Sequence, residues 1–256
     1  MKNLSFLFVA SLSVLSVDLY AANCVYGCPT GVSGQIVERS IYTLNNNSTS
    51  KFANWAAYHI TPATIDGPSR TRTWRADPSI SSANTLEPSD YTNAAAQLGV
   101  DRGHQVPLAS FSNTSDWQAL NYLSNITPQK ANLNQGPWER LESAERNFVR
   151  TKSKDIYVVT GPLNEHYVGS LPAADEFHII PSSYFKVVIL VSGTTVKASA
   201  FIMNQDSGRS DNFCNKEVSI DEIELRTGLN IMPSLSSSIQ APVERGFGGL
   251  KAELGC

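Results

Sequence analysis

The side chains best suited to chemistry gather around one glycine, in the segment Asp101-Arg102-Gly103-His104-Gln105. Histidine has the unperturbed pKa nearest neutral pH, which makes His104 a candidate general base. The arginine two positions earlier suits a phosphate or a carboxylate. Because glycine allows a tight bend, we expect this segment to form a turn that leaves the imidazole accessible. The alternative is a turn with a solvated Asp-Arg pair and a structural histidine.

A second group of polar side chains follows and is rich in amides. Its members are Asn121, Asn125, Gln129, Asn132, Asn134, Glu142 and Arg146. Mg²⁺ prefers oxygen ligands, keeps several waters and is often held through one or two protein groups. A carboxamide oxygen leaves the cation its full charge, which can polarise a phosphoryl oxygen and acidify a bound water. This composition predicts a metal site with Glu142 holding metal-bound waters, unless the asparagines only form turns and helix caps.

These residues resemble the signature of the DNA/RNA non-specific endonucleases, which are ββα-metal nucleases. The likeness covers nearly the whole chain after the N-terminal segment. The matching positions are 23–31, 42–49, 71–72 with 74, 101–105 with 109, 121–130, 133–136, 138 with 140–142, 160–163 and 226–229. The resemblance implies an α+β fold, in which a mixed, mainly antiparallel central sheet is flanked by helices and carries a ββα-metal active-site motif.

The same resemblance implies a role for each candidate residue. His104 would be the general base, Asn134 the direct ligand of Mg²⁺ (with Mn²⁺ as a substitute), and Glu142 would hold the hydrated metal through water. Phosphate charge would be neutralised by Arg72, Arg102 and Arg146. Supporting or substrate-binding roles would fall to Asp101, Asn121, Asn125 and Gln129. The implied activity is hydrolysis of DNA and RNA, single- or double-stranded, with little sequence preference and with 5′-phosphate ends.

Two other functions are compatible with parts of this pattern. One is a catalytically silent, secreted nucleic-acid-binding protein. Such a protein would be expected to lack some of the candidate catalytic residues, whereas His104, Asn134 and Glu142 are all present. A nuclease restricted to one substrate, such as RNA only, is not excluded by the sequence. A zinc hydrolase or a serine hydrolase is disfavoured, because the sequence has no His-x3-His pair and no Gly-x-Ser-x-Gly motif.

Apolar alternation and continuous apolar runs predict the strands that must position these side chains. The expected strands cover residues 35–44, 52–61, 155–163, 181–191 and 196–205, with turns at 45–50 and 192–195. Helices are expected at 89–98 and 219–229, the second ended by Gly228. The tail up to Cys256 is expected to be mixed coil.

Two segments near the candidate residues are less regular. Residues 62–90 are expected to form a long ordered loop, whose three arginines around Trp74 either line a phosphate groove or are solvated. The amphipathic stretch after Asn134 predicts a helix, but it contains Pro137, and an interior proline removes a backbone hydrogen bond. The helix therefore either starts near Asn134, with Pro137 in its first turn, or kinks there.

The overall composition is that of a globular protein, with 41% of the 256 residues hydrophobic and 17% charged. The formal net charge of -3 argues against a general affinity for nucleic acid of the kind that histones have. A phosphate-binding site must therefore be a local cluster of arginines. No internal repeat or clear linker is present, so we expect residues 23–256 to form a single domain.

The N-terminus predicts a secretory signal peptide over residues 1–22. Lys2 provides a positive start, residues 4–17 are apolar but too short to span a bilayer, and small residues follow at 21–22. We expect a secreted protein, extracellular or periplasmic, with no membrane association after the signal is removed. The family resemblance adds a homodimer, although the sequence itself does not determine the oligomeric state.

Four cysteines fit an oxidising compartment: Cys24, Cys28, Cys214 and Cys256. An even number suggests two disulfides, for which three connectivities exist. Nearness in the sequence favours Cys24–Cys28, which leaves Cys214–Cys256. A Cys/His zinc site is the weaker alternative, because no second cysteine pair and no histidine lie close by in the sequence.

Overall fold

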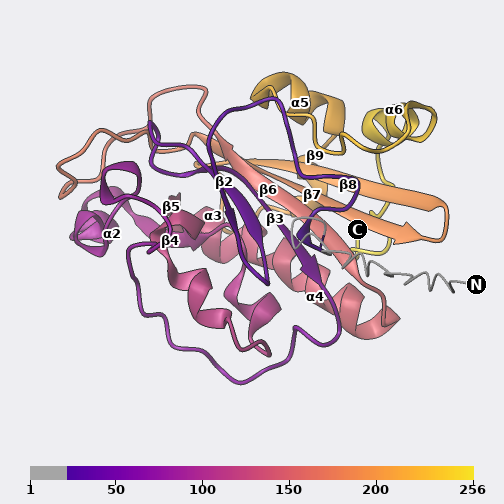
Figure 1. Cartoon of the computed structure of the whole chain (residues 1–256), viewed down its shortest axis with the longest axis horizontal. Helices are drawn as coiled ribbons and strands as arrows, with labels where there is room; N and C mark the ends of the chain where they lie inside the picture. The colour runs from indigo at the N-terminus through magenta and orange to yellow at the C-terminus, as the bar shows by residue number, and fades with distance from the viewer. Residues whose placement is uncertain (1–21) are drawn as a thin grey trace, which may run out of the picture.

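An antiparallel sheet of seven strands forms the middle layer of the molecule (Figure 1). The computed structural model describes residues 22–256, so the expected signal peptide lies outside the described residues apart from Ala22. In spatial order the strands are β1 (Gln35–Glu38), β2 (Thr43–Asn46), β3 (Ala53–Ile60), β6 (Ile156–Leu163), β7 (Ser183–Ser192), β8 (Thr195–Asn204) and β9 (Glu217–Val218). The sheet confirms the expected α+β class, and its pairings are all antiparallel.

Both faces of the sheet are covered, which explains the nearly continuous apolar run of β7. Tyr184 and Val188 point into one core together with Leu141 of α4 (Glu139–Lys152). Phe185 and Val187 alternate with them and enter a second core. This second core is covered by α5 (Ile220–Thr227) and α6 (Ser237–Arg245), which lie across the sheet from α4 in Figure 1. A strand buried on both faces needs apolar side chains at successive positions.

A separate two-stranded sheet leads directly into the long helix. Strands β4 (Val100–His104) and β5 (Ile126–Lys130) pair antiparallel, and the chain continues through α3 (Ala131–Leu133) and η6 (Asn134–Trp138) into α4. This is the expected ββα arrangement, and it places the His104 segment beside the Asn134 segment. The remaining short helices are η1 (Ser82–Asn84), η2 (Pro88–Tyr91), α2 (Ala94–Leu98), η3 (Leu108–Phe111), η4 (Trp117–Asn121), η5 (Leu123–Asn125) and η7 (Phe213–Lys216).

The expectation of a turn around Gly103 is wrong, because residues 100–104 are strand β4. A Cβ atom at Gly103 would lie 2.6 Å from Oε1 and 2.7 Å from Cβ of Gln129, its diagonal neighbour on β5. The glycine is therefore required by the close approach of Gln129, and not by a bend of its own backbone.

Three other local expectations also need correction. The expected strand 35–44 is two strands that turn between Arg39 and Tyr42, where the Arg39 amide donates to the Tyr42 carbonyl at 2.8 Å. As a result, β2 occupies the beginning of the expected turn at 45–50. The expected helix 89–98 is divided into η2 and α2 by Asn93, which has a φ of 62°. The tail is not coil throughout, since it contains α6.

The helix after Asn134 kinks, as the second of the two readings of Pro137 predicted. Gly136 has φ -120° and ψ -117°, outside the helical region, and the regular helix α4 begins at Glu139. The cysteine pairing is also as expected, with disulfides Cys24–Cys28 and Cys214–Cys256.

Replacing Gly136 with alanine is expected to destabilise the protein and to reduce its activity. The new Cβ would lie 2.7 Å from the Arg209 carbonyl oxygen and 2.9 Å from the Arg209 Cα, and backbone atoms yield poorly. Overpacking of this kind costs about 1–3 kcal/mol. Urea unfolding would measure the loss, with Gly193→Asn as the control: Gly193 has φ +60° and no atom within 4 Å of its virtual Cβ, and asparagine tolerates that conformation. Unchanged stability in Gly136→Ala would contradict this account.

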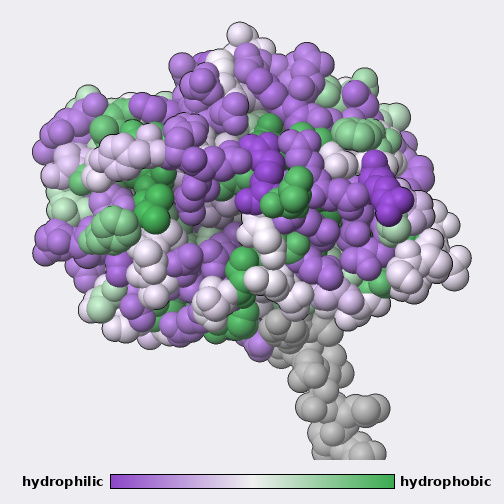
Figure 2. All heavy atoms as spheres, turned by 90° about the horizontal axis from the view of Figure 1, so that it is seen from above, coloured by the Kyte–Doolittle hydropathy of each residue, from purple (hydrophilic) through white to green (hydrophobic). Residues whose placement is uncertain are grey.

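The face that carries α5 and α6 is mostly hydrophilic, and its apolar side chains form small separate groups (Figure 2). Scattered apolar side chains of this kind are normal for a protein surface in water. Within residues 22–256, no helix is long and apolar enough to cross a membrane.

Candidate active site

One cleft of about 1000 Å³ brings together most of the residues that the sequence singled out. It is lined by Arg72 from the loop after β3, by Asp101, Arg102 and His104 from β4, by Asn134 from η6, and by Glu142 and Arg146 from α4. The strand pair and the helix therefore each form a wall of the cleft, and the long loop supplies a third. Asn121, Asn125 and Gln129 do not line this cleft.

The two walls are joined by hydrogen bonds to Asp101. Oδ2 of Asp101 accepts from Nδ2 of Asn134 at 2.8 Å and from Nε2 of Gln135 at 2.7 Å. Because an ionised carboxylate can only accept, the amide nitrogens must face it. The carbonyl oxygen Oδ1 of Asn134 is then the atom left for a ligand. An amide oxygen with a carboxylate nearby fits a hard divalent cation such as Mg²⁺.

Glu142 lines the cleft with the carboxylate that the sequence predicted would hold metal-bound waters. Its side chain is 14% exposed, and Oε1 lies 3.5 Å from Nζ of Lys186 on β7. Burial raises the pKa of Glu142, whereas the positive charges of Lys186 and Arg146 lower it. Glu142 therefore keeps a surface toward the cleft while two cations oppose its protonation.

His104 stands at the end of β4 and is half-buried, with its ring centroid 5.4 Å from that of Trp74. Burial and then the Arg72 charge lower its pKa to about 4, while the neighbouring Asn121 side chain raises it. Nε2 of His104 and Oδ1 of Asn121 are both buried, and neither meets hydrogen-bond geometry with another described residue. A proton on Nε2 would suit that oxygen and would leave the lone pair on Nδ1 to accept a proton, as a general base requires.

The three arginines reach the cleft from three different elements. Arg102 lies over the rings of Tyr91 and Trp74, at 5.0 and 5.7 Å from their centroids. Arg146 donates to Ser143 Oγ at 2.7 Å and lies 3.6 Å from Glu139 Oε1. Arg72 is exposed on its loop. Guanidinium groups placed this way can share the charge of one phosphodiester.

Backbone hydrogen bonds fix the loop that carries Arg72. The Arg75 amide donates to the Asn121 carbonyl at 3.2 Å, and the Leu123 amide donates to the Arg75 carbonyl at 2.9 Å. Nearby, Arg70 Nε donates to the Ser112 carbonyl at 2.7 Å. Of the two readings of the 62–90 loop, the cleft wall is thus the one that the structure supports for Arg72 and Trp74.

The amides outside the cleft hold its backbone. Asn125 accepts from the Val106 amide and donates to the Val106 and Leu120 carbonyls, so it fixes the chain after His104. Gln129 packs against Gly103, and Asn132 is exposed. Sequence reasoning overlooked Gln135 and Lys186. The inward position of Lys186 on β7, between Tyr184 and Val188, was the available signal.

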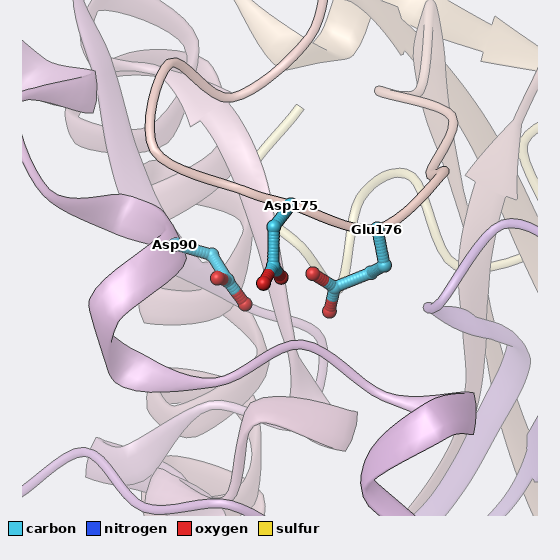
Figure 3. A group of neighbouring side chains, drawn as sticks. All are labelled: Asp90, Asp175 and Glu176. Carbon is cyan, nitrogen blue, oxygen red and sulfur yellow. The ribbon is translucent and has the colours of Figure 1, made fainter.

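Another group of carboxylates lies outside this cleft, between η2 and the loop before β7 (Figure 3). The carboxylate oxygens of Asp90, Asp175 and Glu176 lie within 4.8 Å of one another. However, Oδ2 of Asp90 already accepts from the Glu87 amide as a helix cap. Burial and the two neighbouring aspartates raise the pKa of Glu176. We assign no cation to this group, because its one buried member, Asp90, is already engaged as a helix cap.

Comparison with known proteins decides the family. The sequence model of the DNA/RNA non-specific endonucleases matches residues 19–238. The chain belongs to this family. This endonuclease is 50% identical to "Nuclease" from Serratia marcescens over 237 residues, which cover 91% of this chain and 89% of that protein. It is 28% identical to human "Endonuclease G, mitochondrial" over 225 residues, covering 82% of this chain and 73% of that protein.

A solved structure shows the same fold in the endonuclease G of a complex with its inhibitor, EndoGI. The TM-score is 0.75 at 20% sequence identity, and the match covers 88% of this chain and 95% of that one. At this level of identity the likeness establishes the fold alone. Together with family membership, it accounts for the ββα arrangement around the cleft of this endonuclease.

Proposed function

We propose that this endonuclease hydrolyses phosphodiester bonds of DNA and RNA in a Mg²⁺-dependent reaction, with little sequence preference and with 5′-phosphate products. The observation that carries the proposal is the arrangement of one cleft. There, Asp101 holds the Asn134 amide so that its oxygen is free, and His104 and three arginines line the same space. Phosphodiester hydrolysis needs a base, a neutralised phosphoryl group and a stabilised leaving oxygen, and this set supplies groups for all three.

Each side chain has a task that follows from its surroundings. His104 accepts the proton of the attacking water, because its lowered pKa keeps the imidazole neutral at neutral pH. Arg72, Arg102 and Arg146 bind the phosphate and balance the charge that develops on it. Asn134 would bind Mg²⁺ through Oδ1, and Glu142 would orient waters of the hydrated ion. When bound, the cation supplies Lewis-acid polarisation and eases departure of the 3′ oxygen.

Low sequence preference follows from what the cleft offers to a substrate. The positively charged side chains that line it are arginines, which suit phosphates, and phosphate contacts position a nucleic acid without reading its sequence. Such contacts also do not depend on the 2′-hydroxyl, so DNA and RNA can both be bound. A nuclease restricted to RNA would need groups that recognise this hydroxyl.

Location and assembly form part of the same proposal. The two disulfides suit an oxidising compartment, and we infer that the protein is exported and that residues 1–22 are removed. Residues 23–256 then form a single domain without membrane attachment. This domain acts as a homodimer. Mass spectrometry of the protein secreted by its host would locate the new N-terminus, and light scattering would give the mass of the particle. Retention of residues 1–22, or a monomer at micromolar concentration, would contradict the respective part.

The activity is tested with purified protein beginning at residue 23. Supercoiled plasmid, single-stranded DNA and a long RNA are incubated with Mg²⁺, with Mn²⁺, or with EDTA. We expect all three substrates to be cut with either metal and none with EDTA, and the products to be ligatable through their 5′-phosphates. Cleavage of RNA alone would favour the restricted nuclease, and binding without cleavage would favour the silent protein.

The pH dependence of kcat/KM is expected to report the environment of His104. Since its pKa is lowered from 6.5 to about 4, the base form should persist as the pH falls through 6.5 and be lost only near pH 4. Arg72→Gln removes a charge that lowers this pKa, so the acidic limb of its profile should move to higher pH, whatever the overall loss of rate. Profiles on a short oligonucleotide would check this. An acidic limb at or above 6.5 in the parent, or one that does not move in Arg72→Gln, would argue against this account.

A further inference from the structure

A fully buried lysine lies in the central sheet directly behind the active-site helix. Lys186 sits in the middle of β7 with 0% of its side chain exposed, on the same face as the core residues Tyr184 and Val188. Burying an ammonium group is costly unless it is paired and hydrogen-bonded. Its presence in an otherwise apolar run therefore needs an explanation.

All the contacts that the structure gives to the Lys186 ammonium group come from the first half of α4 and the residue before it. Nζ lies 3.5 Å from Oε1 of Glu142 and 3.5 Å from Oε1 of Glu145, and 4.6 Å from the centre of the Trp138 ring. Only the contact with Glu142 meets hydrogen-bond geometry. The lysine thus reaches through the core from the sheet to a carboxylate on the cleft wall.

Glu145 serves Lys186 as a counter-charge more than as a hydrogen-bond partner. Its side chain is fully buried, and neither carboxylate oxygen is hydrogen-bonded to another described residue. Burial raises the pKa of Glu145 to about 7, against the effect of Lys186. The hydroxyl of Tyr58 lies beside it, and burial followed by the Glu145 charge raises the pKa of that tyrosine.

Glu142 has no comparable partner elsewhere in residues 22–256. Arg146, one turn further along α4, donates to Ser143 and pairs with Glu139. The hydrogen bond from Lys186 is the one that the structure gives to the Glu142 side chain. A free glutamate on a cleft wall would sample several rotamers, and a single buried donor restricts them.

We propose that Lys186 is a positioning residue, whose ammonium group holds the Glu142 carboxylate on the cleft wall while Glu145 balances its charge. This rests on the role given to Glu142 under the proposed function. Partners that orient metal-supporting groups typically affect metal affinity or activity by about 10–100-fold when removed. The competing explanation is that Lys186 only fastens α4 to β7, in which case its effect on activity would follow stability alone.

A charge-balanced pair of substitutions separates these explanations. Lys186→Met alone leaves Glu145 buried without a counter-charge, so we expect a lower Tm and lower activity. Glu145→Gln, the matched control, leaves the Lys186–Glu142 contact in place and should keep kcat close to that of the parent. The double variant Lys186→Met/Glu145→Gln buries no unpaired charge at position 145, and its Tm should recover most of the loss seen in Lys186→Met.

The decisive measurements are made on this double variant at a temperature where it is folded. We expect kcat on a defined oligonucleotide at saturating Mg²⁺ to remain at least about tenfold below the parent value, and Mn²⁺ binding, followed by electron paramagnetic resonance, to be weakened by a similar factor. KM should change less, because the phosphate-binding arginines are untouched. In a Glu142→Gln background, adding the double substitution should cause no further loss of kcat, since Lys186 acts through Glu142.

Several results would overturn the proposal. Recovery of kcat and Mn²⁺ binding together with Tm would make Lys186 purely structural. A double variant that does not regain Tm would refute the charge-balancing role of Glu145. A further loss of kcat in the Glu142→Gln background would show that Lys186 acts elsewhere. An inactive parent protein is a different outcome, because it would refute the proposed function itself.

Discussion

His104→Ala is expected to lower kcat by about 10²–10⁴-fold, the usual contribution of a positioned general base. The imidazole lies on the cleft wall at the end of β4, and its depressed pKa leaves it neutral and ready to accept a proton. KM should change little, because the arginines that would bind the phosphate remain in place. Steady-state cleavage of an oligonucleotide at saturating Mg²⁺ would measure both parameters, and unfolding curves would show that the variant is folded.

The chain offers a matched histidine for this experiment. His59 on β3 lies 3.2 Å from Asp155 and stacks on Tyr157 with ring centroids 4.1 Å apart, and it does not line the cleft. His59→Ala should therefore lose some stability while keeping kcat near the parent value. If His104→Ala cut as fast as the parent, or if both variants lost activity in parallel with stability, His104 would not be the base.

The sequence predicted best the strands that are long and buried over most of their length. Strands β3, β6, β7 and β8 are long and rich in apolar residues, so local pattern and burial agree. The segment 35–44 also alternates, but its division depends on a bend at Arg39, whose guanidinium group lies 4.7 Å from the Tyr122 ring centre. Contacts between residues so far apart in the chain leave no local trace in the sequence.

The same distinction applies to the candidate site. Residue type alone made His104 and Glu142 candidates, whereas Asn134 was singled out among several amides only by the family resemblance. The geometry of the site could not be anticipated from the sequence. Gly103 was expected to make a turn, whereas it is the place where Gln129 of the neighbouring strand comes close. Lys186 lies within an apolar run, and its contact with Glu142 depends on the packing of β7 against α4, which the sequence pattern did not predict.

Asn134→Ala is expected to weaken metal binding and to lower kcat, whereas His104→Ala removes only the base. In the parent protein Asp101 accepts from the amide nitrogen of Asn134 at 2.8 Å, which leaves the amide oxygen available to a cation. The substitution removes this oxygen. A metal contribution of several kcal/mol to transition-state stabilisation corresponds to a loss of about three orders of magnitude in kcat. Mn²⁺ binding should weaken as well. Stability should fall by only about 1 kcal/mol, the typical net value of one hydrogen bond, since Gln135 still donates to Asp101.

Asn132→Ala is the appropriate control, because Asn132 lies two positions earlier, is exposed and does not line the cleft. It should bind Mn²⁺ and cut nucleic acid like the parent. Asn134→Asp adds a useful contrast: it keeps an oxygen ligand but places a second carboxylate beside Asp101, where like charges repel. If Asn134→Ala bound Mn²⁺ normally, the cation would have to be held by other groups, and the hydrogen bond from Asn134 to Asp101 would serve only to join the strand pair to the helix.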